Sequence, residues 1–232
     1  MCFEQHGNVA RKNYTAKIGC RHYIHGTKLV TKVSVMTNRI RLAQPDDARQ
    51  MLAIYTPFIL NNAVSFELDI PTNAEFRSRI THTLTTFPWL VCESEGTIIG
   101  YSYASNHATR GAYKWSVDVS LYVGEEYRRQ GVGRALYTSL FACLRLQGYF
   151  NAYAGITLPN PASIRIHETM GFTYVGVFKD DEYKFGHWHS VGWWELPLQK
   201  RAVPLTPISL PAIKATPGGL EAMNSGIPYL KL

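Results

Sequence analysis

Glycines and arginines crowd into one short stretch of the chain, RRQGVGRA at residues 128–135. Gly131 and Gly133 carry no side chain, so a ligand can approach the backbone closely there. The N–H groups at the start of a helix attract anions, and the apolar pattern predicts a helix that begins in this stretch. Its arginines add positive charge that suits a pyrophosphate: Arg128, Arg129 and Arg134. The stretch therefore indicates an anion site, although glycines also serve ordinary strand-to-helix turns. It is not a usual nucleotide loop, because GxxxxGK[ST] is missing and GxGxxG is incomplete.

Two titratable side chains on either side of this stretch have the chemistry to move protons. A reaction that removes a proton from its substrate near neutral pH needs a base. Asp118 lies on the polar face of a predicted strand and could be that base, or it could be an ordinary carboxylate facing solvent. His167 could act as a general acid, could assist deprotonation, or could simply fill a helix face.

A mixed set of strands and helices must hold these side chains. Alternating valines and leucines predict a strand over residues 115–123, and apolar residues at helical spacing predict a helix over 133–147 that ends at Gly148. Similar patterns predict the other elements: strands at 38–43, 88–94, 97–105, 150–156, 172–178 and 191–198, and helices at about 45–58, 73–84 and 160–170. The order of these elements predicts an α/β (α+β) fold with one central sheet.

The net charge of +7 comes from the two ends of the chain. Residues 1–35 hold six basic residues against one acidic residue, and residues 199–232 hold four against one. Residues 36–198 hold 14 basic and 15 acidic residues, so the body of the protein is not built to bind a polyanion. We therefore expect no nucleic-acid partner.

The composition predicts a single globular domain with tails. With 232 residues, 46% of them apolar and 18% charged, the chain can bury one substantial core. We expect this domain to span residues 38–198. The basic residues 1–37 resemble a transit peptide weakly, but we expect them to be disordered or untranslated, with translation starting at Met36. Prolines and glycines recur through residues 199–232 and predict a flexible tail.

Cysteine spacing and hydropathy predict a cytoplasmic protein without a metal site. No stretch approaches the roughly 20 apolar residues of a membrane span, and no secretion signal opens the chain, so we expect no membrane partner. The cysteines show no paired spacing: Cys2, Cys20, Cys92 and Cys143. Cys2 and Cys20 with His22 and His25 match no zinc pattern either.

Two motifs resemble the GNAT acetyltransferase superfamily. Arg128, Gly131 and Gly133 fit its acetyl-CoA pyrophosphate pattern [RQ]xxGx[GA], and LPNPASIRIHETMGF at 158–172 is similar to its following helix. Longer strings resemble the phosphinothricin and methionine sulfoximine acetyltransferase subgroup: FPWLV, YKWSVDVSLYV, GITLPNPASIRIHE and YKFGHWHSVGWWELPL. The resemblance runs from about Arg39 to Leu198. It implies a mixed, splayed sheet, acetyl-CoA as co-substrate, a small amino-acid-like acceptor and a homodimer.

The resemblance also implies roles for individual residues. Asp118 would be the base, but the subgroup often has Glu there, so a water could bridge the shorter side chain to the amine. His167 stands where many members have a Tyr that protonates the CoA thiolate. One set would bind acetyl-CoA: Leu121, Tyr122, Val123, Arg128, Arg129, Gln130, Gly131, Val132, Gly133, Arg134, Asn160 and Ser163. Another would line the substrate pocket: Phe66, Arg110, Tyr113 and Tyr122. Asn160 and Ser163 also suit helix capping, and the pocket residues also suit packing or the surface.

These residues predict direct attack of the amine on the thioester, with a backbone N–H of residues 121–123 stabilising the oxyanion. Three alternatives stay open. A protein N-terminus, a lysine or a polyamine could be the acceptor. The protein could be a non-catalytic acyl-CoA sensor, because Asp118 replaces the commoner Glu. More remotely, its tails could bind nucleic acid.

Overall fold

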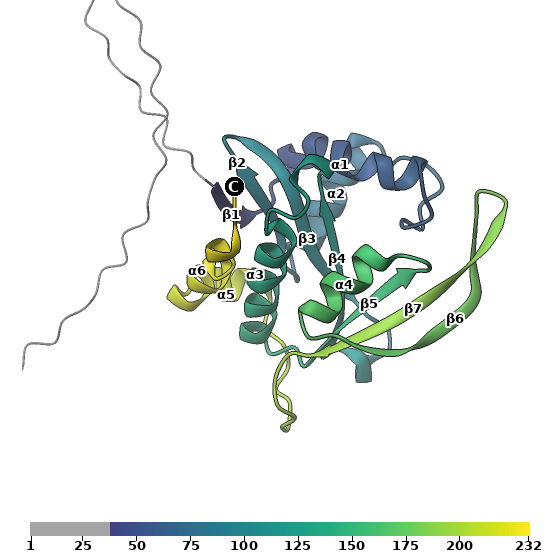
Figure 1. Ribbon diagram of the computed structural model, residues 1–232. Coiled ribbons are helices and arrows are strands. Elements are labelled where there is room, and N and C mark those ends of the chain that lie inside the picture. Colours follow the sequence, from purple (N-terminus) through teal and green to yellow (C-terminus); the bar gives the residue numbers. More distant parts are fainter. Residues whose placement is uncertain (1–37) are drawn as a thin grey trace, which may run out of the picture. The chain divides into compact units, whose positions relative to one another are not determined.

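The computed structural model describes residues 38–232. Seven strands make one sheet in the order β1-β2-β3-β4-β5-β7-β6 (Figure 1). Their bounds are β1 Asn38–Leu42, β2 Trp89–Ser94, β3 Thr97–Asn106, β4 Ser116–Val123, β5 Asn151–Thr157, β6 Thr173–Lys184 and β7 His187–Pro197. Every neighbouring pair is antiparallel except β4 and β5. The predicted mixed sheet is confirmed.

The sheet parts between its two parallel strands. β4 and β5 pair only over Ser116↔Asn151, Val117↔Ala152 and Asp118↔Tyr153. Beyond Asp118 the remaining residues of β4 have no partner in β5, so β4 and β5 diverge like the two arms of a V. The apex of the V lies at the Asp118–Tyr153 pair, and the gap that opens from it could hold a ligand between the strands.

Helices cover both faces of the sheet (Figure 1). On one face lie α3 (Val132–Gln147) and α4 (Pro161–Thr169); on the other lie α1 (Ala48–Leu60), which follows the short helix η1 (Pro45–Asp47), and α2 (Asn73–Thr83). The α3 face buries a large core that includes Leu136, Leu140 and Leu144, all 0% exposed. The α1 face buries a second core rich in aromatic side chains. Apolar residues at helical spacing in α1 and α3 account for both cores.

The predicted flexible tail is wrong for residues 210–229. These residues form α5 (Leu210–Lys214), α6 (Pro217–Asn224) and the short helix η4 (Ile227–Tyr229). The prolines stand at the first or second helical positions, where a missing N–H costs nothing, so they start these helices rather than break them. Buried side chains then hold the segment against α3: Leu210, Ile213 and Ala222 pack around Cys143.

The predictions made for residues 1–37 concern residues outside the described range. Among them is the prediction that Cys2, Cys20, His22 and His25 do not form a zinc site. Within residues 38–232 no helix has both the length and the apolarity needed to cross a bilayer. In the same residues no three His, Cys, Asp or Glu side chains lie together as metal ligands would.

Candidate active site

The glycine-rich loop takes a backbone shape that few sequences tolerate. After β4 the chain passes through the short helix η3 (Glu125–Tyr127) and then bends, with φ of 63° at Arg129 and 83° at Gly131. Positive φ favours glycine, and a Cβ on Gly131 would also lie 2.0 Å from the carbonyl oxygen of Tyr229. Gly131 is therefore required twice, by its own backbone and by the C-terminal segment beside it.

Unused backbone donors gather at this loop. None of the N–H groups from residue 129 to residue 134 donates a hydrogen bond to any acceptor in residues 38–232, and the start of α3 has no side-chain cap. A bend followed by a helix N-terminus turns such donors toward a common point, where they bind anions. The geometry suits the predicted anion site, because these donors, including those that every helix start leaves unpaired, are available to a ligand.

The side chains of the loop are held from both sides. The Arg128 guanidinium lies 3.6 Å from the Glu125 carboxylate and 5.8 Å from the Phe58 ring centroid. Arg134 stacks 4.2 Å above the ring of Tyr229. Gln130 donates through Nε2 to the Glu126 carbonyl at 2.8 Å, and the backbone carbonyl of Gln130 accepts from the backbone N–H of Lys231 at 3.0 Å.

The open edge of β4 leads from the apex to this loop. The N–H of Gly124 donates to Ile99 in β3 at 3.0 Å, so in an unbroken ladder the N–H groups of Val123 and Leu121 point the opposite way, toward the gap beside β5. The side chain of Tyr122 faces the α1 side and packs against Tyr55 at 4.8 Å between ring centroids. Leu121 packs instead into the core under α3.

Asp118 stands at the apex, at the last paired position of β4. Its side chain is 31% exposed and faces the α1 side of the sheet, as Tyr122 does. Burial raises the pKa of this carboxyl above its ordinary value, and a hydrogen bond from His107 acts in the opposite direction. The two atoms concerned, His107 Nδ1 and Asp118 Oδ1, lie 2.7 Å apart.

His107 was missed by the sequence reasoning. It follows β3 in a polar loop and belongs to no motif. The only available signal was the hairpin register, which sets Ser105 opposite Asp118 and so carries residue 107 past the carboxylate. That register cannot be read until the loop between the strands is known.

His167 is buried, with 5% of its surface exposed. Its Nδ1 lies 2.8 Å from the carbonyl oxygen of Ser163, and its Nε2 lies 2.8 Å from the hydroxyl of Tyr137 in α3. Because a carbonyl only accepts, neutral His167 carries its proton on Nδ1, and Nε2 accepts from Tyr137. Burial lowers the pKa of His167. The helix-packing interpretation thus describes its contacts, and the acid role stays a prediction.

Asn160 caps α4, since its side-chain oxygen accepts from the N–H of Ser163 at 3.1 Å. The capping interpretation of Asn160 is confirmed, and it leaves the amide nitrogen of the side chain for another partner. The Ser163 hydroxyl lies 3.3 Å from His167 Nδ1. Both residues stand at the start of α4, on the same side of the sheet as the glycine loop.

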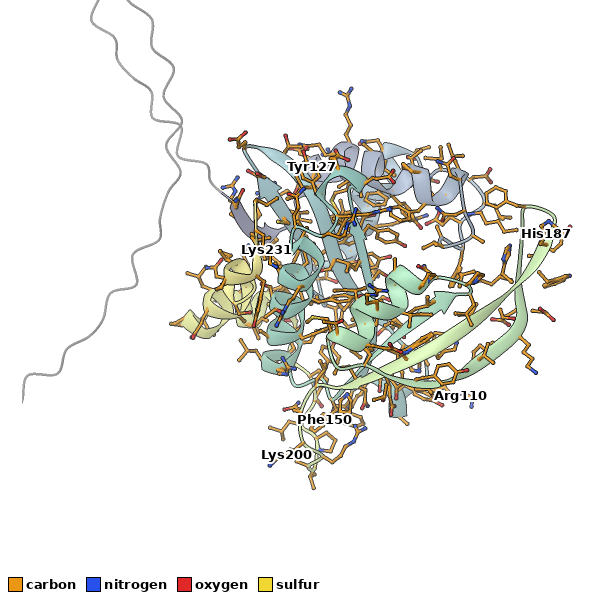
Figure 2. The ribbon with its side chains drawn as sticks, viewed as in Figure 1. Arg110, Tyr127, Phe150, His187, Lys200 and Lys231 are labelled. Atoms are coloured by element: carbon orange, nitrogen blue, oxygen red, sulfur yellow. The ribbon has the colours of Figure 1, made fainter. Side chains whose placement is uncertain are left out.

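The substrate residues predicted from the resemblance do not form one cluster. Tyr113 lies at the apex, with its ring centroid 5.9 Å from that of His107, and Tyr122 is packed among aromatic rings. Phe66 and Arg110 are exposed on separate loops, and Figure 2 shows Arg110 well apart from Tyr127, the residue just before the glycine loop.

A cavity of about 140 Å³ lies instead under α1 and α2. It is lined by aromatic rings and one ion pair: Tyr55, Phe76, Trp89, Tyr101, Tyr103, Thr83 and the paired Glu67 and Arg79. None of the predicted substrate residues lines it. Its residues come from three helices or loops and two strands, so no local pattern could have gathered them.

Known proteins match this chain over the region that holds these residues. The family model described as acetyltransferase (GNAT) domain matches residues 40–193. A phosphinothricin N-acetyltransferase of Streptomyces viridochromogenes is 37% identical over 73% of this chain and 95% of its own length. An L-methionine sulfoximine/L-methionine sulfone acetyltransferase of Salmonella typhimurium is 29% identical over 71% of this chain and 97% of its own. Among solved structures, a phosphinothricin acetyltransferase of Sinorhizobium meliloti in complex with AcCoA superposes with a TM-score of 0.66, at 32% identity, over 70% of this chain and 89% of its own.

Proposed function

Because the chain belongs to the GNAT acetyltransferase family, we propose that it transfers the acetyl group of acetyl-CoA to the α-amino group of a small amino-acid analogue of the phosphinothricin or methionine sulfoximine type. The observation that carries this proposal is the row of unused N–H groups at residues 129–134, joined by the open edge of β4 to the carboxylate at the apex.

The loop and the strand edge fit the shape of acetyl-CoA. The free N–H groups and Arg128, Arg129 and Arg134 suit its pyrophosphate. The backbone N–H groups of Leu121 and Val123 suit the carbonyl oxygens farther along the molecule, including the thioester oxygen at which negative charge develops. Asn160 and Ser163 at the start of α4 complete the binding residues that we propose. Bound there, acetyl-CoA supplies an activated acyl group.

The reaction then needs a base on the acceptor side of the apex. Asp118 faces that side, and we propose that it helps remove the proton from the acceptor ammonium, with the neutral nitrogen then attacking the thioester carbon. Departure of the CoA sulfur requires a proton, for which His167 and its partner Tyr137 are the candidates nearest α4. Phe66, Arg110, Tyr113 and Tyr122 remain the proposed acceptor contacts, with Arg110 suited to a carboxylate or phosphinate.

Direct attack without an acyl-enzyme fits the cysteines in residues 38–232. Cys92 and Cys143 are both 0% exposed. Burial raises the pKa of each thiol to about 12, so neither supplies a thiolate near neutral pH. Their unpaired state also supports a cytoplasmic location, which we propose for this protein. We also propose that residues 38–198 hold the catalytic machinery, with residues 210–229 packed against α3 as part of the same unit.

The test is turnover. Purified protein with acetyl-CoA and either phosphinothricin or methionine sulfoximine should release free thiol, and Asp118→Asn should lower kcat by about 100-fold or more, the usual share of a general base. Acetyl-CoA binding should survive this change, because Asp118 lies outside the loop. Binding of acetyl-CoA with no thiol release for any amine would indicate a sensor instead of an enzyme.

We further propose a homodimer that forms through the β6–β7 hairpin. Large apolar side chains are exposed along this hairpin: Tyr174, Val175, Val177, Phe178, Tyr183, Phe185 and Trp188. So many exposed apolar side chains on one hairpin support an interface, since a solvated surface rarely gathers them. Light scattering should report a dimer that Trp188→Asp weakens. Leu220→Asp, at an equally exposed position on α6, is the control and should leave the mass unchanged.

A further inference from the structure

The imidazole of His107 is held at the apex by four side chains. It stacks on Tyr153 of β5 at 4.3 Å between ring centroids with an interplanar angle of 20°. The ring of Trp193 of β7 approaches it edge-on at 6.0 Å, and Tyr113 approaches similarly. Asp118 fixes the fourth contact through Nδ1 at 2.7 Å. A ring with this many neighbours has a set orientation rather than the freedom of a surface histidine.

This orientation leaves one nitrogen for chemistry. Asp118 engages Nδ1, and Nε2 makes no hydrogen bond to any atom of residues 38–232. A carboxylate bound at Nδ1 keeps the proton on that nitrogen, so the lone pair stands on Nε2. The pair therefore presents a base whose reactive atom lies one ring beyond the carboxylate.

The chain has a reason to use such a relay. Asp118 has one methylene fewer than Glu, so its own oxygens end closer to the strand. An imidazole hydrogen-bonded to Asp118 places a basic nitrogen farther out on the acceptor side of the sheet, so no bridging water is needed. Imidazoles as a class also lie nearer to an ammonium in pKa than carboxylates do, which favours them as bases toward amines near neutral pH.

We infer that His107, oriented by Asp118, is the group that takes the proton from the acceptor amine. This inference rests on the proposed function and assigns the base within it. The ammonium gives one proton to Nε2 of His107. Its nitrogen then forms a bond to the thioester carbon, and the carbon–sulfur bond breaks with its electron pair on sulfur. The second proton lost from nitrogen neutralises the thiolate, and the proton on His107 leaves to solvent. Asp118 becomes a positioning residue that stabilises the imidazolium.

The charged and titratable groups around His107 come from several elements. Asp118 of β4 faces it directly, Tyr113 lies on the loop after β3, and Tyr153 lies beneath it on β5. Burial raises the pKa of Tyr153, the charge of Glu195 of β7 raises it further, and Arg201 acts in the opposite direction. A change in activity on replacing any one of these residues therefore reports on the whole group, and only replacement of His107 itself tests the imidazole.

His107→Phe is the sharpest test, because a phenyl ring keeps the stack on Tyr153 but has no basic nitrogen. We expect kcat to fall by about 100-fold or more with unchanged acetyl-CoA affinity. His107→Ala should fall similarly and recover part of its rate in added imidazole. His82→Phe, at an exposed position in α2, is the matched control and should keep full activity.

The possible failures are distinct. A wild-type protein that releases no thiol with any amine would overturn the proposed function itself. An active wild type with an equally active His107→Phe variant would overturn only the assignment of His107 and would return the base role to Asp118. A slow His107→Ala variant that imidazole cannot rescue, together with an active His107→Phe variant, would show a packing role.

Discussion

Tyr229 lies against the loop that we propose holds the pyrophosphate, and its removal tests whether the C-terminal segment shapes that loop. The ring supports the Arg134 guanidinium at 4.2 Å, and two residues later the Lys231 N–H holds the carbonyl of Gln130 at 3.0 Å. A cation–π contact at such a site contributes about 0.5–1 kcal/mol, and a backbone hydrogen bond about 0.5–1.5 kcal/mol. Together these two contacts stabilise the ordered conformation of the loop by about 1–2.5 kcal/mol.

If the ligand must otherwise impose this order, the loss appears in its affinity. Tyr229→Ala should weaken acetyl-CoA binding about threefold to fivefold, and deletion of residues 229–232 should weaken it about fivefold to 70-fold, since about 1.4 kcal/mol is tenfold in Kd. Tyr229→Phe keeps the ring and should bind like the wild type. Titration calorimetry on each variant gives the Kd, and thermal melting verifies that the variants are folded.

Unchanged affinity in a folded deletion variant would refute the reasoning, because the loop would then hold its shape unaided. Tighter binding would refute it in another way. It would mean that Tyr229 withdraws Arg134 from the phosphate instead of presenting it.

Two other predictions follow from backbone crowding and from burial. Gly131→Ala should lower both the melting temperature and the acetyl-CoA affinity. Gly96→Ala is the control and should have smaller effects, because Gly96 has the same φ of 83° but no atom within 4 Å of a new Cβ. Equal effects would mean that the contact with Tyr229 is unimportant. His167 has a lowered pKa when folded, so the unfolded chain binds its proton first as the pH falls below about 6.5. Stability should therefore decline as the pH drops from about 6.5 through the folded pKa, and His167→Gln should flatten this decline in urea melts, with His82→Gln as control.

The elements that were predicted well from the sequence each show a complete strand or helix pattern of apolar residues within their own segment. β4 alternates, and α3 repeats its leucines at helical spacing until Gly148 ends it in a left-handed conformation with φ of 91°. The β6–β7 hairpin extends well beyond the predicted 172–178 and 191–198. Most residues of its outer half are exposed, so no apolar alternation marks it. Its strands are specified by pairing with each other, which a local pattern does not record.

Long-range contacts account for what was missed in the site and the tail. The loop at 128–135 could be predicted because one segment holds all of its glycines and arginines. His107 and Asp118 meet across a hairpin, and Arg79 meets Glu67 across the start of α2. Residues 210–229 fold because Leu210 and Ile213 are buried against α3. The prolines of this segment give no indication of that contact.

The separation of the two faces also bears on the order of events. In the proposed assignment, CoA approaches the apex along the open edge leading to α3, whereas the amine approaches from the side of α1 and α2, where Asp118 and His107 face. Neither reactant blocks the path of the other. Both must be present at once, so initial rates should give intersecting rather than parallel double-reciprocal lines. A dead-end analogue of one reactant should then leave the entry of the other open.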